Sequence, residues 1–286
     1  MTVLVIGGTG RIGKFAVEKL TTNGTKTRVF SRSEEKLKQL PNNAIGVTGD
    51  LENIDSLSNV FEGVDKLLLI TANGETETQR GLNAIKQAKL ANLSKIVFIS
   101  VKLSKEAMKV PHYASKVPIE DLIKNSGIHF TILRPDFYYQ NDLLLEKPIT
   151  LGGLYTMPIG NIGQNRIDTR DVADASVNAL LSDEFNGMEI PLYGPKAWTA
   201  NDIANAYSQN LGKKINYAGD DLDAWAESSK AFMPPWLISA LKAGFAKMQA
   251  MGSIATDEEI KNSEKIVGHP LRKFEDFVRE VTEKWK

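Results

Sequence analysis

The stretch VLVIGGTGRIGKF, residues 3–15, decides the fold class. An apolar run leads directly into glycines at 7, 10 and 13, and a helix-like pattern resumes after them. Gly7 permits a tight turn, Gly10 lets backbone approach a pyrophosphate, and Gly13 lets the helix pack closely on the strand. Free amides at the helix start then face the anion. The expected dinucleotide contacts in this loop are Gly7, Thr9, Gly10, Arg11, Ile12 and Gly13.

A competing interpretation starts from the same glycines. Gly8, Gly13 and Lys14 nearly match the nucleotide-triphosphatase pattern G-x-x-x-x-G-K-[ST]. The last position is Phe15, which cannot ligate magnesium, and this argues against phosphoryl transfer. A purely structural glycine turn is the remaining alternative.

The first half of the chain alternates between short apolar runs and helical patterns. Near-continuous apolar strands separated by helices are typical of a parallel sheet covered on both faces. The sequence therefore predicts an α/β fold with a Rossmann-like, doubly wound parallel sheet. The expected strands are 2–6, 26–30, 44–48, 66–70, 95–99 and 129–133.

After Pro135 the pattern becomes irregular and Gly-rich, and then mostly helical. We expect an NAD(P)-binding domain over 1–150 and a smaller, mostly helical C-terminal substrate lobe over 151–286. The boundary is soft because no flexible linker marks it, so part of the lobe could return to the main sheet. The expected helices are 171–182, 199–211, 234–251, 256–265 and 273–284.

Composition excludes several classes of function. The 286 residues carry 35 Lys plus Arg and 35 Asp plus Glu, so the net charge of zero indicates no nucleic-acid or membrane partner. There is no cysteine, which excludes disulfides, thiolate metal sites and Cys nucleophiles. His129 and His269 have no metal partners at useful spacing, so no metal is expected. We expect a cytoplasmic monomer or homodimer.

The ends of the next strands hold further candidate dinucleotide contacts. Folds that prefer NAD carry an acid after the second strand, whereas this chain has Ser31 and Arg32. A guanidinium pairs bidentately with a 2′-phosphate, so Arg32 favours NADP(H), and Arg11 is placed to reach the same phosphate. A solvated charge at a helix start is the alternative for Arg32, and Asp50 could equally cap the following helix. The other strand-end candidates are Asp50, Leu51, Thr71, Ala72 and Asn73.

These features together resemble the atypical short-chain dehydrogenase/reductases, specifically the NmrA-like branch. The resemblance covers almost the whole chain, and it implies similarity to type 2 NAD(P)H:quinone oxidoreductases and triphenylmethane-dye reductases. The branch also holds proteins that bind the dinucleotide only to sense it. The matching stretches are GGTGRIG, FSR, GD (49–50), KIVFIS, SGIHFTILRPDFYYQN, IDTRDVADA and GHPLRKFEDFVRE.

The resemblance also implies catalytic roles. In ordinary members a Lys holds the nicotinamide ribose and lowers the pKa of a Tyr acid four residues earlier, and a Ser polarises the carbonyl. Lys116 and Ser100 occupy the Lys and Ser places, but His112 occupies the Tyr place and Tyr113 lies one residue later. Residues three and four apart share a helical face, so His112 or Tyr113 could accompany Lys116. His112 is the first choice, because its pKa suits proton donation near neutrality.

The expected substrate is small, flat and apolar. Pro135 and Phe137, after the sixth strand, are expected to face the nicotinamide, with Tyr138 and Tyr139 nearby. The Met- and Trp-rich segment 223–252 predicts either a lid or the core of the lobe. A quinone needs little acid catalysis, so positioning dominates. We expect an NADPH-dependent reductase of quinones, enones, imines or dyes; the alternatives are an NADP(H)-binding redox sensor without turnover and a sugar-nucleotide epimerase or dehydratase.

Overall fold

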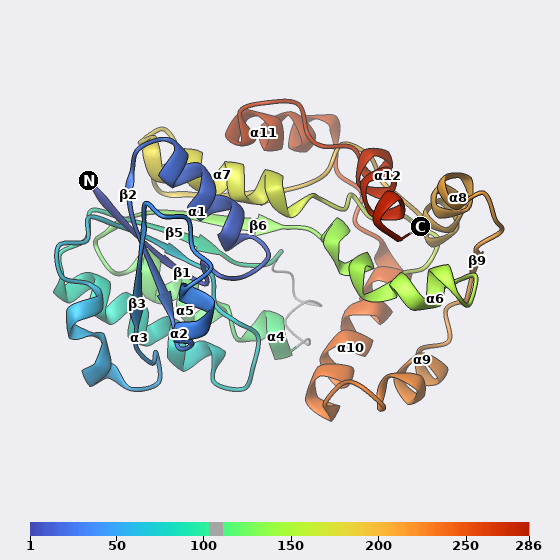
Figure 1. Ribbon diagram of the computed structural model, residues 1–286, viewed down its shortest axis with the longest axis horizontal. Coiled ribbons are helices and arrows are strands. Elements are labelled where there is room, and N and C mark those ends of the chain that lie inside the picture. The colour runs from blue at the N-terminus through green and yellow to red at the C-terminus, as the bar shows by residue number, and fades with distance from the viewer. Residues whose placement is uncertain (103–110, 286) are drawn as a thin grey trace.

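The structure is a computed structural model that describes residues 1–102 and 111–285, apart from the side chains of Ser58, Pro111 and His112. The chain forms a seven-stranded parallel sheet in the order β3-β2-β1-β4-β5-β6-β8 (Figure 1). The doubly wound α/β fold expected from the alternating pattern is confirmed. The strands are β1 (Thr2–Ile6), β2 (Lys26–Ser31), β3 (Ala44–Thr48), β4 (Lys66–Leu69), β5 (Lys95–Ile99), β6 (His129–Pro135) and β8 (Met188–Leu192).

Six of these strands follow the apolar runs of the sequence. Five of them are largely buried, whereas β3 lies at the edge of the sheet and is partly exposed. Every residue of β5 is buried, and Val5 of β1 pairs with Val29 on one side and Leu68 on the other. The strand that the sequence did not predict is β8, which carries exposed Met188 and Glu189 and an internal Pro191. Proline is tolerated there because β8 is an edge strand that pairs only with β6 among the described residues.

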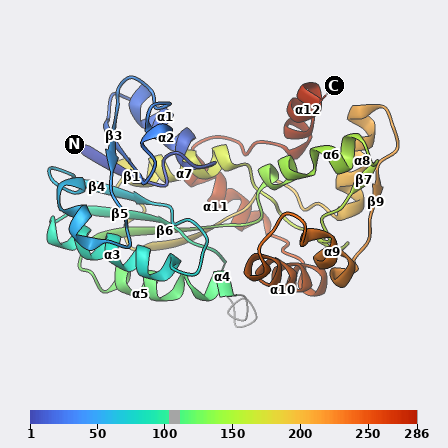
Figure 2. The same cartoon turned by 60° about the horizontal axis from the view of Figure 1, so that its bottom comes forward.

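Helices cover both faces of the sheet (Figure 2). One face packs on α1 (Gly13–Thr22), α7 (Thr169–Leu181) and α11 (Asp257–Val267). The other face packs on α3 (Glu77–Leu90), α5 (Val117–Lys124) and the 3₁₀ segment η1 (Ile54–Val60). Both α7 and α11 follow residue 150, as does β8, so the sheet layer draws on late segments of the chain. A short helix, α2 (Glu34–Leu37), lies between β2 and β3.

The smaller lobe has its own aromatic core. Within it lies a buried ion pair: the side chains of Arg166 and Asp142 are both 0 % exposed, and Arg166 Nη2 lies 2.7 Å from Asp142 Oδ1. The hydroxyls of Tyr155 and Tyr207 also donate to Asp142, which leaves this buried carboxylate well compensated. The elements of the lobe are η3 (Tyr139–Leu145), α6 (Glu146–Thr150), β7 (Leu154–Tyr155), α8 (Ala200–Leu211), β9 (Asn216–Tyr217), α9 (Leu222–Ser229), α10 (Pro235–Met251) and α12 (Phe274–Trp285).

The helices expected after residue 170 are all present, with ends shifted by one or two residues, and α9 is an addition. Helix α8 begins with a capping box between Thr199 and Asp202, and α11 with one between Thr256 and Glu259, which is why their starts could be predicted locally. Among the described residues, no helix combines the length and the apolar character needed to span a membrane.

Candidate functional site

The glycine loop lies where the strand order reverses between β1 and β4, the usual ligand position in this class of sheet. Gly7 has φ of +83°, and a Cβ on it would lie 2.5 Å from the Ile70 carbonyl oxygen. A Cβ on Gly13 would lie 2.2 Å from the Gly7 carbonyl oxygen. The Gly10 amide donates to that same oxygen at 3.0 Å and closes the turn. This cradle fits a pyrophosphate and admits no side chain at Gly7 or Gly13.

A groove of about 500 Å³ runs from the glycine loop across the ends of β4 and β5. It brings together most of the residues that the sequence suggested as dinucleotide contacts. From that set, the structure places along the groove Gly7, Gly10, Arg11, Ile12, Gly13, Thr71, Ala72, Asn73, Ser100 and Lys116.

The other suggested contacts lie beyond this groove. Thr9 is half-buried inside the loop, and Ser31 is buried at the end of β2, where its hydroxyl accepts from the Ser33 amide. Arg32 is exposed and forms no hydrogen bond or ion pair with any residue that the structure describes. Leu51 is buried after β3, and next to it Asp50 accepts from the Glu52 amide at 3.0 Å, so Asp50 shapes a turn.

Arg11 takes a different direction from the one the sequence suggested. Its guanidinium reaches across the groove to η3 and donates to the Gln140 carbonyl at 3.2 Å and to Asn141 Oδ1 at 3.4 Å. The glycine loop and the smaller lobe are therefore linked directly over the groove.

Lys116 is held in the floor of the groove by a closed network of polar groups. Its Nζ lies 2.6 Å from Glu77 Oε1 and donates to Thr71 Oγ1 at 2.7 Å. The Thr71 hydroxyl donates to Glu77 Oε1 at 2.7 Å, and Ser115 donates to Glu77 Oε2 at 2.8 Å. Burial lowers the pKa of Lys116, and the Glu77 carboxylate opposes that shift. The proton of the Thr71 hydroxyl is committed to Glu77, so this hydroxyl is not available as a donor to a ligand.

Ser100 is oriented away from the role that the resemblance implied. Its hydroxyl donates to Glu120 Oε1 at 2.6 Å, and Glu120 in turn accepts from Arg134 at 2.5 Å. Because the single proton of the hydroxyl is committed to a buried carboxylate, Ser100 is not arranged to polarise a carbonyl.

The structure does not place Tyr113 and Lys116 on one continuous helix. Helix α4 (Pro111–Ala114) ends before Lys116, and α5 starts afresh with Pro118 in its first turn. The structure does not confirm the shared helical face that was one option for these two residues: Lys116 lines the groove, whereas Tyr113 lines a second cavity. The His112 side chain lies outside the described residues.

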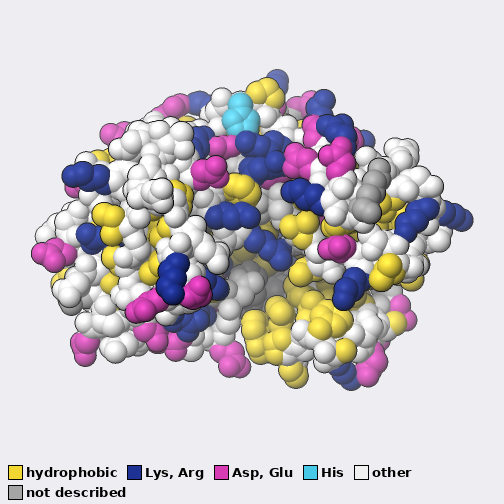
Figure 3. Space-filling view, viewed as in Figure 1, with side chains coloured by type: hydrophobic (Ala, Val, Ile, Leu, Met, Phe, Trp, Pro, Cys, Tyr) yellow, Lys and Arg dark blue, Asp and Glu magenta, His cyan; other side chains and the backbone are white. Residues whose placement is uncertain are grey.

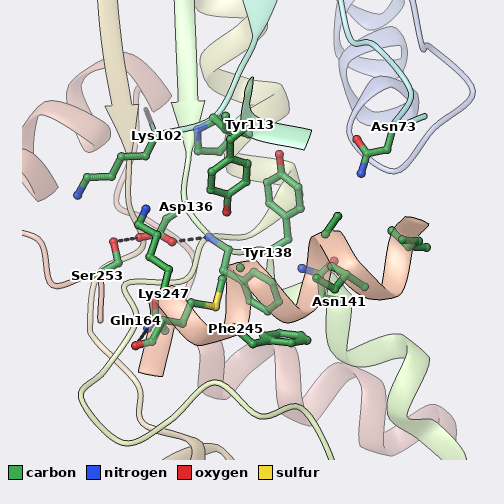
Figure 4. Close-up of a pocket in the computed structure, with 18 of the residues that line it drawn as sticks. Asn73, Lys102, Tyr113, Asp136, Tyr138, Asn141, Gln164, Phe245, Lys247 and Ser253 are labelled. Atoms are coloured by element: carbon green, nitrogen blue, oxygen red, sulfur yellow. Dashed lines mark hydrogen bonds between the residues drawn. The ribbon is translucent and has the colours of Figure 1, made fainter. Parts of the chain in front are cut away.

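The second cavity, of about 240 Å³, lies between the end of β6 and helix α10 (Figure 4). Pro135 and Phe137 line this cavity and not the groove, and the Phe137 ring meets Phe245 edge-on at 6.4 Å. In Figure 3 the surface is hollowed between the two lobes, with apolar side chains gathered over α10. The residues that line both the groove and the second cavity are Asn73, Val101, Tyr138 and Asn141.

Some side chains of the Met- and Trp-rich segment line the second cavity, and others belong to the core of the smaller lobe. Trp236 and Met248 line the second cavity. Trp225 packs edge-on against Phe245 at 4.9 Å in the core of the lobe. Phe232 is 70 % exposed and contributes to neither.

One end of the second cavity is polar. Asp136 accepts a hydrogen bond from the Ser253 hydroxyl and another from the Phe137 amide at 2.7 Å. Burial raises the pKa of Asp136, against the opposing effect of the nearby Lys102 and Lys247. Burial and the Asp136 charge together raise the pKa of Tyr113 to about 12, the opposite of the acidified Tyr in ordinary members of the superfamily.

Sequence reasoning missed this polar end. Asp136 directly follows β6, and strand-end position was a usable signal for it. Ser253 is 117 residues further along the chain, and nothing in the sequence links it to Asp136.

His269 has acidic neighbours that sequence spacing did not reveal. Its ring, Asp171 and Asp174 offer ligand atoms within 4.8 Å of one another. Arg272 donates to both carboxylates, and Lys19 lies 2.7 Å from Asp174 Oδ1. These cations supply the neutralising charge, so the cluster is explained as an ion-pair network between α1, α7 and the chain before α12.

The family model described as the NmrA-like family matches residues 1–277. The chain belongs to the NmrA-like family. It is 28% identical to the prestalk A differentiation protein A of Dictyostelium discoideum, covering 98% of this chain and 92% of that protein. It is 27% identical to the NAD(P)H azoreductase of Xenophilus azovorans, covering 97% and 96%.

Solved structures share the fold. The NADPH-dependent quinone oxidoreductase of Escherichia coli complexed with NADPH matches with a TM-score of 0.87 at 22% identity, over 98% of this chain and 99% of that one. NmrA, a negative transcriptional regulator in complex with NADP, matches with a TM-score of 0.81 at 19% identity, over 99% and 95%. Proteins that share this fold thus include an NADPH-dependent quinone oxidoreductase and a negative transcriptional regulator, each solved with NADP(H).

Proposed function

We propose that this protein is an NADPH-dependent reductase of small, flat, electron-poor acceptors, with quinones first and enones, imines or dyes next. The observation that carries the proposal is the junction of the two cavities. The groove fits a dinucleotide, the second cavity has aromatic and aliphatic walls, and Asn73, Val101, Tyr138 and Asn141 line both. A dinucleotide in the groove and a flat molecule in the cavity would therefore meet.

The chain would hold the cofactor at three points, two in the groove and one beyond it. The amides of the loop from Gly7 to Gly13 would bind the pyrophosphate, and the exposed Arg32 would pair with the 2′-phosphate. The buried Lys116 would bind the nicotinamide ribose while Glu77 fixes its position. The bound cofactor supplies a hydride; the chain supplies position and a cavity that excludes water.

The geometry favours acceptors that need little acid catalysis. The pKa of Tyr113 is raised to about 12, and the Ser100 hydroxyl is bound to Glu120. Lys116 lines the groove and not the second cavity. An unactivated ketone needs an acid to take up its developing charge, whereas the reduced form of a quinone is a comparatively stable anion. The same reasoning disfavours a sugar-nucleotide epimerase or dehydratase, which needs an acidified Tyr.

Anaerobic oxidation of NADPH, followed at 340 nm with a quinone, an enone, an azo dye and an unactivated ketone, tests the proposal. We expect turnover with the quinone and the least turnover with the ketone. Lys116→Ala is the site variant, and Lys261→Ala, an exposed substitution on α11 that lines neither cavity, is the matched control.

A second function is favoured by the raised pKa of Tyr113 and the commitment of Ser100 to Glu120, together with the NADP-bound regulator among the fold neighbours. Tight binding of NADPH with no oxidation by any acceptor would contradict the reductase and support an NADP(H)-binding regulator. Equal and weak binding of NADPH and NADH would contradict both.

A further inference from the structure

Tyr138 holds a position that no other aromatic side chain of the described structure shares. It is the only aromatic residue there that lines both the groove and the second cavity. Its backbone is fixed on two sides: its carbonyl accepts from Arg166 Nη2 at 3.0 Å, and it forms a β-bridge with Ile167. The ring is therefore held at the place where cofactor and acceptor would meet.

The Tyr138 hydroxyl forms no hydrogen bond with any described residue, whereas other tyrosine hydroxyls of the lobe do. Tyr139 donates to the Arg272 carbonyl, Tyr155 to Asp142 and Tyr217 to Asp220. The Tyr138 side chain is partly buried and lines both cavities, so its hydroxyl, without a partner among the described residues, is free to donate to a ligand bound there. Figure 4 shows the Tyr138 and Tyr113 rings within the same cavity, with their hydroxyls pointing in opposite directions.

We propose that the Tyr138 hydroxyl donates a hydrogen bond to the anion that forms on the reduced acceptor. The inference rests on the proposed reductase function. The acceptor gains two electrons and one hydrogen from NADPH, which becomes NADP⁺. The negative charge then lies on the acceptor's oxygen or nitrogen, beside the Tyr138 hydroxyl, and is later neutralised by a proton from water.

Tyr138 acts in this proposal as a neutral donor and keeps its proton. Burial, with the nearby Tyr113 and Asp136, raises the pKa of Tyr138. In ordinary members a Lys ammonium acidifies the Tyr. The Lys at that place here, Lys116, is instead bound to Glu77 and Thr71 in the groove. A preorganised neutral donor stabilises developing charge without proton transfer, as in an oxyanion hole. Its benefit grows as the reduced acceptor becomes more basic.

The kinetic test uses Tyr138→Phe with a series of ring-substituted quinones of graded reduction potential. We expect kcat to fall about ten-fold for the most electron-rich quinone and less for electron-poor ones, because one hydrogen bond from a neutral donor to the developing anion is lost. NADPH affinity should stay unchanged. Tyr217→Phe, whose hydroxyl lines neither cavity, is the matched control and should leave all rates unchanged.

A binding test does not depend on turnover. With NADP⁺ saturating, 4-nitrophenol in the second cavity should ionise more readily in the unmodified protein than in Tyr138→Phe, and the substitution should raise the pKa of the bound phenol by about one. An unchanged phenol pKa, or a uniform loss of rate across the quinones, would overturn the role of Tyr138. A loss of kcat that grows with the electron richness of the quinone in Tyr113→Phe, but not in Tyr138→Phe, would assign the role to Tyr113. No NADPH oxidation by the unmodified protein would instead defeat the proposed function.

Discussion

Replacing Glu77 by Gln removes the one carboxylate within ion-pair distance of Lys116 among the described residues. Their side chains are 1 % and 5 % exposed, and the Nζ–Oε1 distance is 2.6 Å. Breaking a buried ion pair by removing one partner costs about 3–5 kcal/mol. The Gln amide keeps one oxygen that can accept from Lys116 or Thr71, so we expect the lower end, about 3 kcal/mol.

The assay is urea unfolding followed by far-UV circular dichroism at several pH values. Glu75→Gln, an exposed change two residues earlier, is the control and should alter the free energy of unfolding by less than about 0.5 kcal/mol. Burial lowers the folded-state pKa of Lys116, and the loss of Glu77 lowers it further. Lys116 then releases its proton as the pH rises, so the deficit of Glu77→Gln should shrink between pH 7 and pH 10. A deficit equal to the control, or one that grows with pH, would refute the reasoning.

Three further predictions concern the groove and the second cavity. Arg32→Ala should weaken NADPH binding ten- to a hundred-fold, about 1.5–3 kcal/mol for a charge-assisted contact, and leave NADH binding unchanged in fluorescence titrations; equal affinities before mutation would contradict this. Gly13→Ala places a Cβ 2.2 Å from the Gly7 carbonyl oxygen, so it should destabilise the fold by about 1–3 kcal/mol in urea unfolding and weaken NADPH binding. Burial raises the folded-state pKa of Asp136, so the unmodified protein should lose stability relative to Asp136→Asn as the pH rises from about 4, the ordinary carboxyl value. Parallel stability curves for Asp136→Asn and the unmodified protein would show that the carboxyl is not perturbed.

The parts of the fold that the sequence predicted are those determined locally. Strands buried on both faces appear as apolar runs, and the glycine cradle needs only residues 7–13 and the adjoining strand. Strand β8 was missed because Pro191 and the exposed Glu189 hide its pattern at the sheet edge. The break between α4 and α5, which separates Tyr113 from Lys116, has a signal in the sequence, since Pro118 lies in the first turn of α5.

The remaining features of the site depend on contacts between distant segments. The bonds of Ser100 to Glu120 and of Arg11 to Gln140 follow from packing between elements, which no local pattern encodes. The junction at Tyr138 likewise depends on α10, which lines the second cavity but lies far from Tyr138 in the sequence. The residue types at strand ends could be predicted, but the partners that consume their hydrogen-bonding groups could not.

In the proposed reaction, hydride passes from NADPH in the groove to an acceptor in the second cavity. The most direct measurement is an anaerobic single turnover with a quinone, using NADPH that carries deuterium at C4 on one face or on the other. We expect oxidation to depend on the quinone and to be slowed by deuterium on one face only. Absorbance at 340 nm that persists with every quinone, or oxidation that is insensitive to deuterium on both faces at the chemical step, would contradict it.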